Sequence, residues 1–486
     1  MITQGRYLFI LIFWASISMA EANPISAPVG ESVTTAPVDQ PVPTPPTTTT
    51  NTTTTSSSPA TPPSSPTLES VLKATLKQNG MIQEANQDIE IARSQIELAR
   101  SALFPKASAT ILGAPMPEIR GDTNSSKVNL GKWGPFLLGS LQVVEPIYSF
   151  GMISSYQKAA AEQFEAKSEL AQAKKNDVTL MAKEFYYGYL MAKDLEALVE
   201  DLSSFLQEAI KSVEEGSDEQ KSKSKVKPHD LYSLKTALAD LQQKKLYASA
   251  AKRTAEKALN WVSGSTYESF ESISSGIETY EKKSFEDYLN LAKKNRPEFK
   301  ALASGIKARA ALKEAKEAQS YPVIFLGGMI TKGWSPVADK QMSTFANDPF
   351  NGIQGGLGLG LRFDLEFARQ SAEAHEQEAE MMKLKATESY AIPGIELQVK
   401  KAYLELEQAA QGLEIAAERK KLGKKWFVSN AMGFSVGITP AKDLMESLEG
   451  SGNARKNYIE TVYSLNMALA KLSQAIGTEV TQLKYQ

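Results

Sequence analysis

Leucine and glycine alternate along residues 355–361, which read GGLGLGL, and apolar residues keep alternating with polar ones as far as Asp364. A period of two predicts a β-strand that has one apolar face. Apolar residues on one face and small or polar residues on the other are typical of a strand in a transmembrane barrel. A strand of a soluble sandwich is the alternative, but a solvated face made of three glycines would be unusual there.

Three more strands are predicted in the chain. One lies at residues 134–147, although Leu138 blurs its alternation, and the others lie at residues 106–115 and 323–331. A polar loop is predicted at residues 118–132. The strands therefore come in two pairs, far apart in the sequence.

A very long helical pattern follows each strand pair. The first runs from Met152 to about Val213 without a proline, which is roughly 90 Å at 1.5 Å per residue. The second ends near Ala431 and contains Pro393, which is expected to kink it at most. The other helices are predicted at residues 68–104, 230–262, 300–320 and 440–474.

The junctions between strand and long helix differ in the two halves. Pro146, Phe150 and Gly151 are the junction residues in the first half, and Phe367 is the one in the second. A proline and a glycine let the chain change from period 2 to period 3.6 at the first junction. The second junction makes the same change without either residue.

The two halves repeat one another. Pro105 and Phe150 each have a counterpart 217 positions later, at Pro322 and Phe367. A repeat of this length indicates a duplicated half-protein rather than a solenoid unit of about 20–50 residues. Each repeat has the order helix, strand, strand, long helix, helix. The predicted parts are a first repeat at residues 68–262, a connecting insert at 263–283, a second repeat at 284–478 and a C-terminal tail at 479–486.

Residues 1–22 are predicted to be a secretory signal peptide, with Arg6 before a short apolar core and small residues near the cleavage site. A membrane anchor is the alternative, but the apolar run is shorter than the ~20 residues of a spanning helix. Residues 23–67 are almost wholly Pro, Thr, Ser, Ala and Val, which predicts a disordered, extended tether. The chain has no cysteine, so disulfides and thiolate metal sites are excluded.

No catalytic constellation is found, so we expect no enzyme activity and no cofactor. His229 and His375 lie far apart and lack partners at metal-ligand spacing, so no metal site is expected either. The glycine-rich run at residues 355–360 lacks the Lys-Ser/Thr of a phosphate-binding loop. A formal net charge of −2 over 486 residues gives no general attraction to nucleic acid.

Four membrane strands in one chain cannot close a barrel, because the smallest single-chain barrels need about eight. Open strand edges are not tolerated in lipid, since their N–H and C=O groups would lack partners. The chain must therefore share strands with copies of itself. Two copies give about eight strands and three give about twelve, and only the larger barrel leaves a wide lumen.

The order of these features resembles the TolC-like outer membrane efflux proteins, or outer membrane factors. The resemblance rests on the proline-ended helices (LFP and YP), the junction EPIYSFG and the segment FSVGITPAKDLMES, and it covers residues 68–478. It implies a mainly α fold with a membrane β-barrel portion. Long antiparallel helices of a homotrimer would form a tunnel of about 12 helices, continuous with a barrel of about 12 strands, four from each chain.

The resemblance also implies a location, a function and partners. The protein would lie in the cell outer membrane, in contact with its lipid, and would have a long periplasmic extension. It would be a passive exit duct of a tripartite efflux or type I secretion system, with its helical tips docked to a periplasmic adaptor (membrane fusion) protein and an inner-membrane transporter. The alternative is a periplasmic coiled-coil scaffold without a pore, which the strand at residues 355–363 disfavours.

The family places a pore constriction at the helical turns farthest from the barrel. In the second of these tips, Asp443 and Glu446 share one helix face at i,i+3 spacing. If that face lines the bore, a trimer stacks two rings of carboxylates that select cations. The alternative is a surface pair near a helix N-terminus, where negative charge is favoured.

The first tip supplies a further gate residue, Asp230, which follows Pro228. The family implies that a tyrosine and an arginine of the second tip tie this aspartate down. Phe434 and Thr439 stand at those places here, and neither can make the same polar contact, so the tips must close differently. The predicted tip residues for adaptor contact are Gly437, Thr439, Phe434, Pro228 and Pro440.

Overall fold

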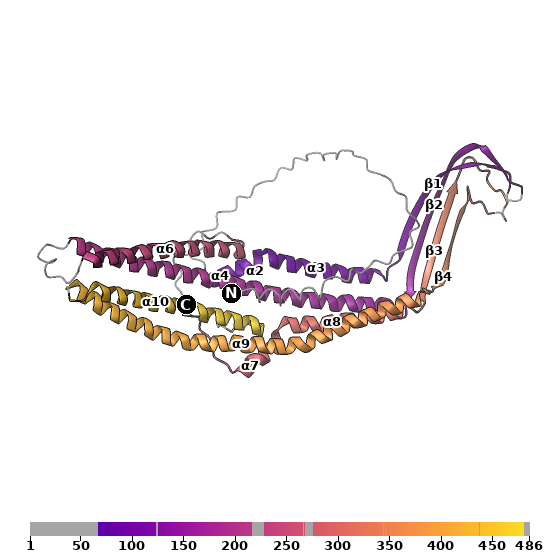
Figure 1. Ribbon diagram of the computed structural model, residues 1–486. Coiled ribbons are helices and arrows are strands. Elements are labelled where there is room, and N and C mark those ends of the chain that lie inside the picture. Colours follow the sequence, from indigo (N-terminus) through magenta and orange to yellow (C-terminus); the bar gives the residue numbers. More distant parts are fainter. Residues whose placement is uncertain are drawn as a thin grey trace, which may run out of the picture. The chain divides into compact units, whose positions relative to one another are not determined.

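The computed structural model describes residues 67–122, 125–215, 228–265, 267, 276–343, 345, 347–436 and 438–480, with the backbone alone at 228–230. Residues Pro63–Gln486 form one compact unit. Its described part is mostly helical, with four strands in a single sheet at one end of the helices (Figure 1). The predicted mainly α fold with a strand portion is confirmed. The predicted signal peptide and nearly all of the tether lie outside the described residues.

The first repeat folds in the predicted order of elements. These are α2 (Leu68–Gln78), α3 (Gly80–Ser101), β1 (Lys106–Arg120), β2 (Lys127–Tyr148), α4 (Met152–Glu215) and α6 (Pro228–Ser263). The long helix α4 has 64 residues, close to the predicted length.

The second repeat has the same order. Its elements are α7 (Phe285–Asn295), α8 (Pro297–Ala318), β3 (Val323–Trp334), β4 (Ile353–Arg362), α9 (Phe367–Ser435) and α10 (Ala441–Ile476). Helix α9 has 69 residues and continues through Pro393. The first residues of α7, α8 and β3 each follow those of α2, α3 and β1 by 217 positions, so the sequence offset is also the structural one.

The single helix predicted at residues 68–104 is wrong, because the chain breaks it at Asn79. The backbone of Asn79 is extended, with φ −67° and ψ 128°. Its side chain accepts a hydrogen bond from the N–H of Met81 at 2.9 Å and so caps α3. The same side chain donates from Nδ2 to the C=O of Val262 at 2.8 Å. Buried residues Val71 and Ile82 keep helical spacing across the break, which is why periodicity alone did not reveal it.

The second repeat breaks at the equivalent residue, Arg296, between α7 and α8. The backbone of Arg296 is extended (φ −66°, ψ 121°), and Pro297 is the first residue of α8, where its missing N–H costs nothing. The buried guanidinium of Arg296 donates to Glu298 at 3.0 Å and to Gln398 at 2.9 Å. The two breaks therefore share a position and differ in the side chain that stabilises them.

The sheet has the order β1-β2-β3-β4, and each neighbouring pair is antiparallel. Residues opposite one another in such pairs point to the same face. By this register one face is apolar and carries Ile111, Leu137, Leu141, Leu326, Ile330, Leu357 and Leu359. The other face is mixed. It carries the small or polar residues Ser108, Thr110, Ser140, Gln142, Thr331, Gln354, Gly356, Gly358 and Arg362, together with the larger apolar residues Leu112, Leu138, Val144, Phe325 and Met329. The alternation read from the sequence thus becomes two continuous faces.

The loop predicted at residues 118–132 is too long, because β1 and β2 extend into it and leave only residues 121–126 between them. The register shifts between Pro117 and Glu118, since Pro117 faces Trp133 while Glu118 faces Asn129. These strand ends lie beyond the apolar face of the sheet. A strand that needs no apolar face can be polar throughout, so its sequence looks like a loop.

The helices form two sets of neighbours. Near the sheet the order is α3-α4-α8-α9, and away from the sheet it is α6-α4-α10-α9 (Figure 1). Helices α4 and α9 take part in both sets because of their length. None of the described helices has an apolar stretch long enough to cross a bilayer.

Apolar cores hold the helices together where the two sets meet. One core joins α9 and α10 to α7, with Val399, Leu469 and Tyr288 fully or almost fully buried. A second joins α4, α6 and α2, with Ala182 and Leu259 at its centre. The two short helices α2 and α7 therefore serve as packing pieces in the middle of the long ones.

Replacing Asn79 by Ala should remove the cap of α3 and leave the C=O of Val262 without its donor. We expect a loss of about 1–3 kcal/mol in unfolding free energy, seen as a lower Tm. Asn86→Ala, at an exposed position of α3, is the matched control and should change the Tm little. Equal Tm values for the two variants would contradict this role of Asn79.

Candidate functional site

The acidic pair predicted at the second tip lies in the first turns of α10. Asp443 and Glu446 are both exposed, whereas Leu444 and Ser447 are completely buried. The carboxylates therefore lie on the side of α10 that faces away from this chain's own core. Their spacing brings them to one face, as the sequence indicated.

A tight turn joins α9 to α10. The C=O of Gly433 accepts hydrogen bonds from the N–H groups of Ile438 at 2.8 Å and Thr439 at 3.1 Å. The side chain of Asn430 donates to the C=O of Asp443 at 3.2 Å. Pro440 precedes α10 and makes no side-chain cap. The turn is thus closed by backbone groups and by the side-chain amide of Asn430. Gly437 lies outside the described residues.

The side chain of Phe434 is half-buried in an apolar cluster that connects all four helices at the tips. The buried residues of this tip cluster are Leu206, Ile210, Leu234 and Leu448, from α4, α6 and α10. Phe427 of α9 meets Phe205 of α4 edge to face, with 4.8 Å between ring centroids. Apolar packing therefore joins the two helix pairs, where the family resemblance implied a polar tie.

Sequence reasoning missed this tip cluster, although a signal was present. Phe427 and Phe434 are seven residues apart on α9, which is the spacing of a helix seam. A polar contact reinforces the cluster, since Arg455 of α10 donates to Asp201 of α4 at 2.8 Å. Both partners are partly exposed, so we assign this ion pair a small share of the stability.

Helix α6 begins at Pro228, in the first tip. The side chains of Pro228 and Asp230 lie outside the described residues, so their predicted tip and gate roles stay predictions. Close by, Lys235 of α6 binds Glu214 at the end of α4 at 2.8 Å. The carboxylate of Glu214 raises the pKa of Lys235 by a hydrogen bond to the ammonium group.

The first strand–helix junction is a left-handed turn. Phe150 has φ 48° and Gly151 has φ 90°. This conformation is free for glycine and costs roughly 1–2 kcal/mol for other residues. The ring of Phe150 stacks on Tyr321 at 5.9 Å between centroids and meets Tyr148 edge-on at 4.7 Å, and these contacts offset the strain. Pro146 lies just before, within β2, where the register with β3 shifts.

The second junction needs no left-handed residue. Phe367 begins α9, and Gln370 in its first turn is 1% exposed. Gln370 donates from Nε2 to the C=O of Asp364 at 3.0 Å and accepts from Ser320 Oγ at 3.1 Å. A buried glutamine thus fastens the linker after β4 to the end of α8. Nothing in the sequence indicated this contact. The equivalent residue of the first repeat is Ile153, which is buried and whose side chain cannot form hydrogen bonds.

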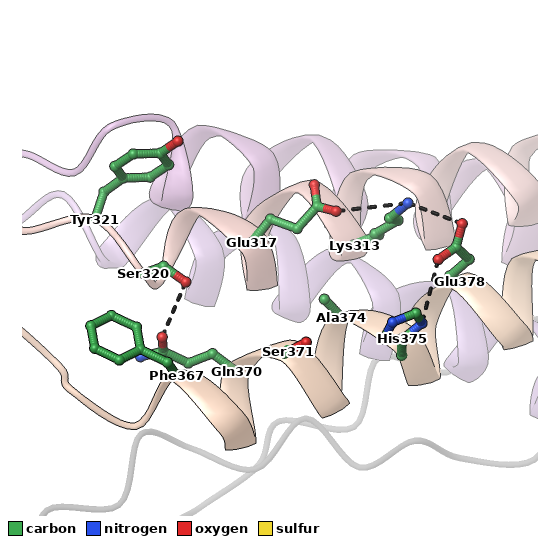
Figure 2. A pocket seen from close by; sticks show the side chains of 10 residues that line it. All are labelled: Lys313, Glu317, Ser320, Tyr321, Phe367, Gln370, Ser371, Ala374, His375 and Glu378. Carbon is green, nitrogen blue, oxygen red and sulfur yellow. Dashed lines mark hydrogen bonds and ion pairs between the residues drawn. The ribbon is translucent and has the colours of Figure 1, made fainter.

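A shallow hollow of about 450 Å³ lies beside the second junction, between α8 and α9 (Figure 2). Lys313 of α8 binds Glu378 of α9 across the hollow at 3.1 Å, and it also binds Glu317 of its own helix at 3.7 Å. His375 is exposed and lies 3.7 Å from Glu378. The described residues hold no group of His, Asp and Glu suited to a metal ion. We read this hollow as a charge-paired seam between helices.

Residues 288–478 match the family model described as outer membrane efflux protein. No curated protein sequence matches the chain.

Several solved outer membrane proteins share the fold. The Campylobacter jejuni CmeC outer membrane channel superposes with a TM-score of 0.68 at 14% identity, over 86% of this chain and 87% of that one. The open state of the Neisseria gonorrhoeae MtrE outer membrane channel gives 0.67 at 16% identity, over 86% and 91%. The outer membrane protein VceC of Vibrio cholerae gives 0.68 at 13% identity, over 85% and 96%.

Long antiparallel helices that run into a four-stranded sheet with one apolar face are therefore the fold of an outer membrane channel. Its second repeat is an outer membrane efflux protein domain, and the resemblance of the chain to the TolC-like efflux proteins is confirmed. The match of residues 288–478 to outer membrane efflux proteins supports the predicted location in the outer membrane.

Replacing Gly151 by Ala tests the first junction. No atom lies within 4 Å of the added Cβ, so the cost should come from φ 90° alone, about 1–2 kcal/mol in unfolding free energy. Gly188→Ala is the control, because its Cβ also meets nothing and Gly188 lies inside α4, where alanine is favoured. We expect thermal unfolding to show a lower Tm for the first variant and an unchanged or higher Tm for the second. The opposite order would refute the strain at Gly151.

Proposed function

We propose that the chain assembles as a homotrimer and forms a passive exit duct through the outer membrane. The open sheet is the observation that carries this proposal, because among the strands that the structure describes β1 and β4 each have one neighbouring strand. In a bilayer every unpaired N–H or C=O costs several kcal/mol, so these edges need strands from other copies. Three copies supply about twelve strands, which leave a lumen.

The edge helices support the same assembly. Leu98 on α3 is 67% exposed, and Leu397 and Ile415 on α9 are 69% and 71% exposed. On α6, Leu246 is 72% exposed. These helices stand at the ends of the two neighbour orders, so their apolar residues are available to the helices of an adjacent copy. The trimer then closes a ring of helices that continues the barrel.

The duct works with partners, because a passive channel supplies no energy of its own. The helical tips would dock to a periplasmic adaptor protein, and an inner-membrane transporter would deliver the cargo. Val436 and Ile438, in the turn between α9 and α10, are 68% and 70% exposed and give the tip an apolar contact surface. The transporter, rather than the duct, would select among drugs, metal ions or proteins.

The acidic pair at the second tip provides a test of the bore. Asp443→Asn combined with Glu446→Gln removes two charges per chain, or about six from a trimer, and should reduce cation selectivity. In planar bilayers with a KCl gradient, the reversal potential should move towards zero. Glu460→Gln, a change at a half-buried position farther along α10, should leave the reversal potential unchanged. Unchanged selectivity in the double variant would place the pair outside the bore.

The assembly itself is tested by fractionation and chemical cross-linking of the full chain. We expect recovery from the outer membrane fraction, a cross-linked species of three chains, and ion conductance after reconstitution. Recovery as a soluble monomer without conductance would overturn the duct and favour a periplasmic scaffold.

A further inference from the structure

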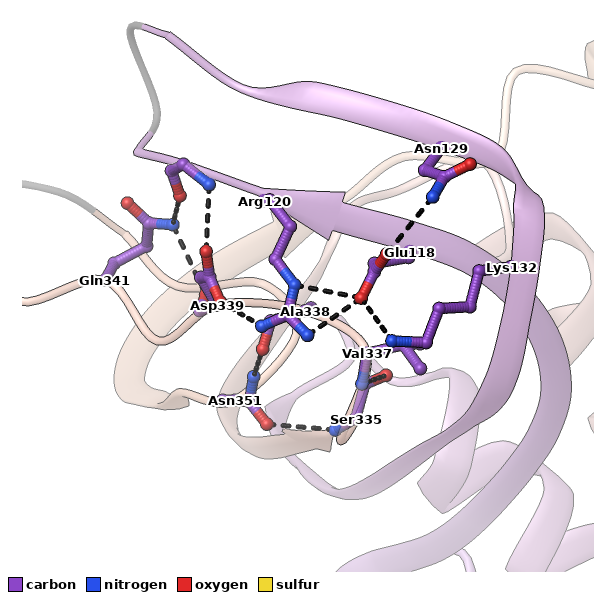
Figure 3. A network of polar contacts seen from close by, with 11 residues as sticks. Glu118, Arg120, Asn129, Lys132, Ser335, Val337, Ala338, Asp339, Gln341 and Asn351 are labelled. Carbon is purple, nitrogen blue, oxygen red and sulfur yellow. Dashed lines mark hydrogen bonds and ion pairs between the residues drawn. The ribbon is translucent and has the colours of Figure 1, made fainter.

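The loop between β3 and β4 crosses the sheet and returns to its far edge. After Trp334 it passes over β2, where Ser335 Oγ donates to the C=O of Pro135 at 3.0 Å and Val337 lies against Gly134. It then pairs in parallel with the end of β1, through the bridge between Ile119 and Ala338. A segment that follows the third strand thus lies against the first (Figure 3).

This pairing uses the backbone groups of Ile119 that the sheet leaves free. Ile119 faces Val128 of β2 on one side. On its other side its N–H donates to the C=O of Val337 at 2.9 Å, and its C=O accepts from the N–H of Asp339 at 3.1 Å. Each residue has a single backbone N–H. Ile119 therefore cannot pair with a strand of another copy while the loop is in place.

A polar clasp holds the loop there. Glu118 is 7% exposed and accepts hydrogen bonds from three side chains. These are Arg120 at 2.8 Å, Lys132 at 2.8 Å and Asn129 at 3.3 Å. Arg120 also donates to Asp339 of the loop, whose second oxygen accepts from the N–H of Gly121 at 3.0 Å (Figure 3). The Gly121 N–H and the Arg120 guanidinium hold the pKa of Asp339 below its usual range, so the clasp is charged at neutral pH.

Apolar contacts reinforce the clasp. Val337 and Ala338 of the loop are buried with Met116 of β1. The rings of Phe136 and Phe350 pack against them, edge to face at 5.9 Å between centroids. The loop is therefore anchored by a small core of its own as well as by polar contacts.

The exposure of β1 changes where the loop begins to cover it. Residues 106–113 of β1 are exposed, whereas Met116 and Glu118 are buried. Strand β1 has 15 residues and β4 has 10. The two outer edges match in length only if the end of β1 is excluded, and the loop occupies that end.

We propose that the β3–β4 loop is a stop that ends strand pairing between copies of this chain. The β4 strand of a second copy pairs with residues 106–116 of β1, and the loop of the first copy closes the edge beyond. This inference rests on the trimeric duct proposed above. The stop fixes the length of the seam, which is the row of backbone hydrogen bonds between β1 of one copy and β4 of the next. It also covers the end of β1, which would otherwise be an open edge able to pair with further strands outside the membrane.

A chain without cysteine makes disulfide mapping direct. Ala109→Cys combined with Leu357→Cys, Leu359→Cys or Leu361→Cys should form disulfides between different chains. On non-reducing gels of membranes these appear as a ladder of linked dimers and trimers. Ile119→Cys with Ala338→Cys should link within one chain and shift its mobility without a ladder. Ile119→Cys combined with Ile353→Cys, at the first residue of β4 and therefore the nearest to Ile119 in this antiparallel arrangement, should give no link between chains.

The outcomes separate the two proposals. A ladder from Ile119→Cys would show that the seam passes the loop, which overturns the stop and leaves the trimer intact. No ladder from Ala109→Cys with any of the three β4 cysteines would overturn the trimeric barrel itself.

The clasp is tested in the same background. Asp339→Asn removes the charge that holds Arg120, so the yield of the Ile119–Ala338 disulfide should fall at least two-fold. Lys340→Gln changes the charge of the neighbouring loop residue without touching the clasp and should keep the original yield. Equal yields in the two variants would show that the clasp does not hold the stop.

Discussion

The edges of the four-stranded sheet impose the constraint on which the rest of the structure depends. Lipid offers no hydrogen bonds, so every N–H and C=O that the outer edges of β1 and β4 would expose to lipid must meet another strand. The same requirement reaches the helices, because each strand leads into one and the edge helices carry exposed apolar rows. A trimer satisfies both needs at once, and the β3–β4 loop decides where the strand pairing ends.

The two strand–helix junctions show that the passage from strand to helix can be stabilised by different interactions. The first uses a strained Phe150 and a permissive Gly151, supported by aromatic contacts. The second uses no left-handed residue and instead satisfies the linker through the buried amide of Gln370. Duplication preserved the position of the junction, while the interactions that stabilise it diverged.

At the tips, too, one kind of interaction takes the place of another: apolar packing stands where the family resemblance implies a polar tie. Phe434 and Thr439 cannot make the polar tie that the family implies, and the tip cluster of α4, α6, α9 and α10 is apolar instead. Apolar packing responds little to salt or pH, whereas an ionic tie responds to both. The sequence revealed the missing donor, but the side chains that replace it could be found only from their packing.

Local periodicity let the sequence by itself determine the long helices, the strands with their apolar face, the 217-residue repeat and the acidic pair at Asp443 and Glu446. It failed at Asn79, because a helix break that preserves periodicity leaves no signal, and at residues 118–132, because a strand outside the bilayer can be polar. Tertiary structure alone decided the polar contacts of Gln370, the contact of Phe427 with Phe205 in the tip cluster, and the clasp around Glu118. The contacts that tie these groups to other elements join residues far apart in the chain: Gln370 and Ser320 are separated by 50 positions, Arg120 and Asp339 by 219, and Asp201 and Arg455 by 254. Such contacts depend on how the elements pack.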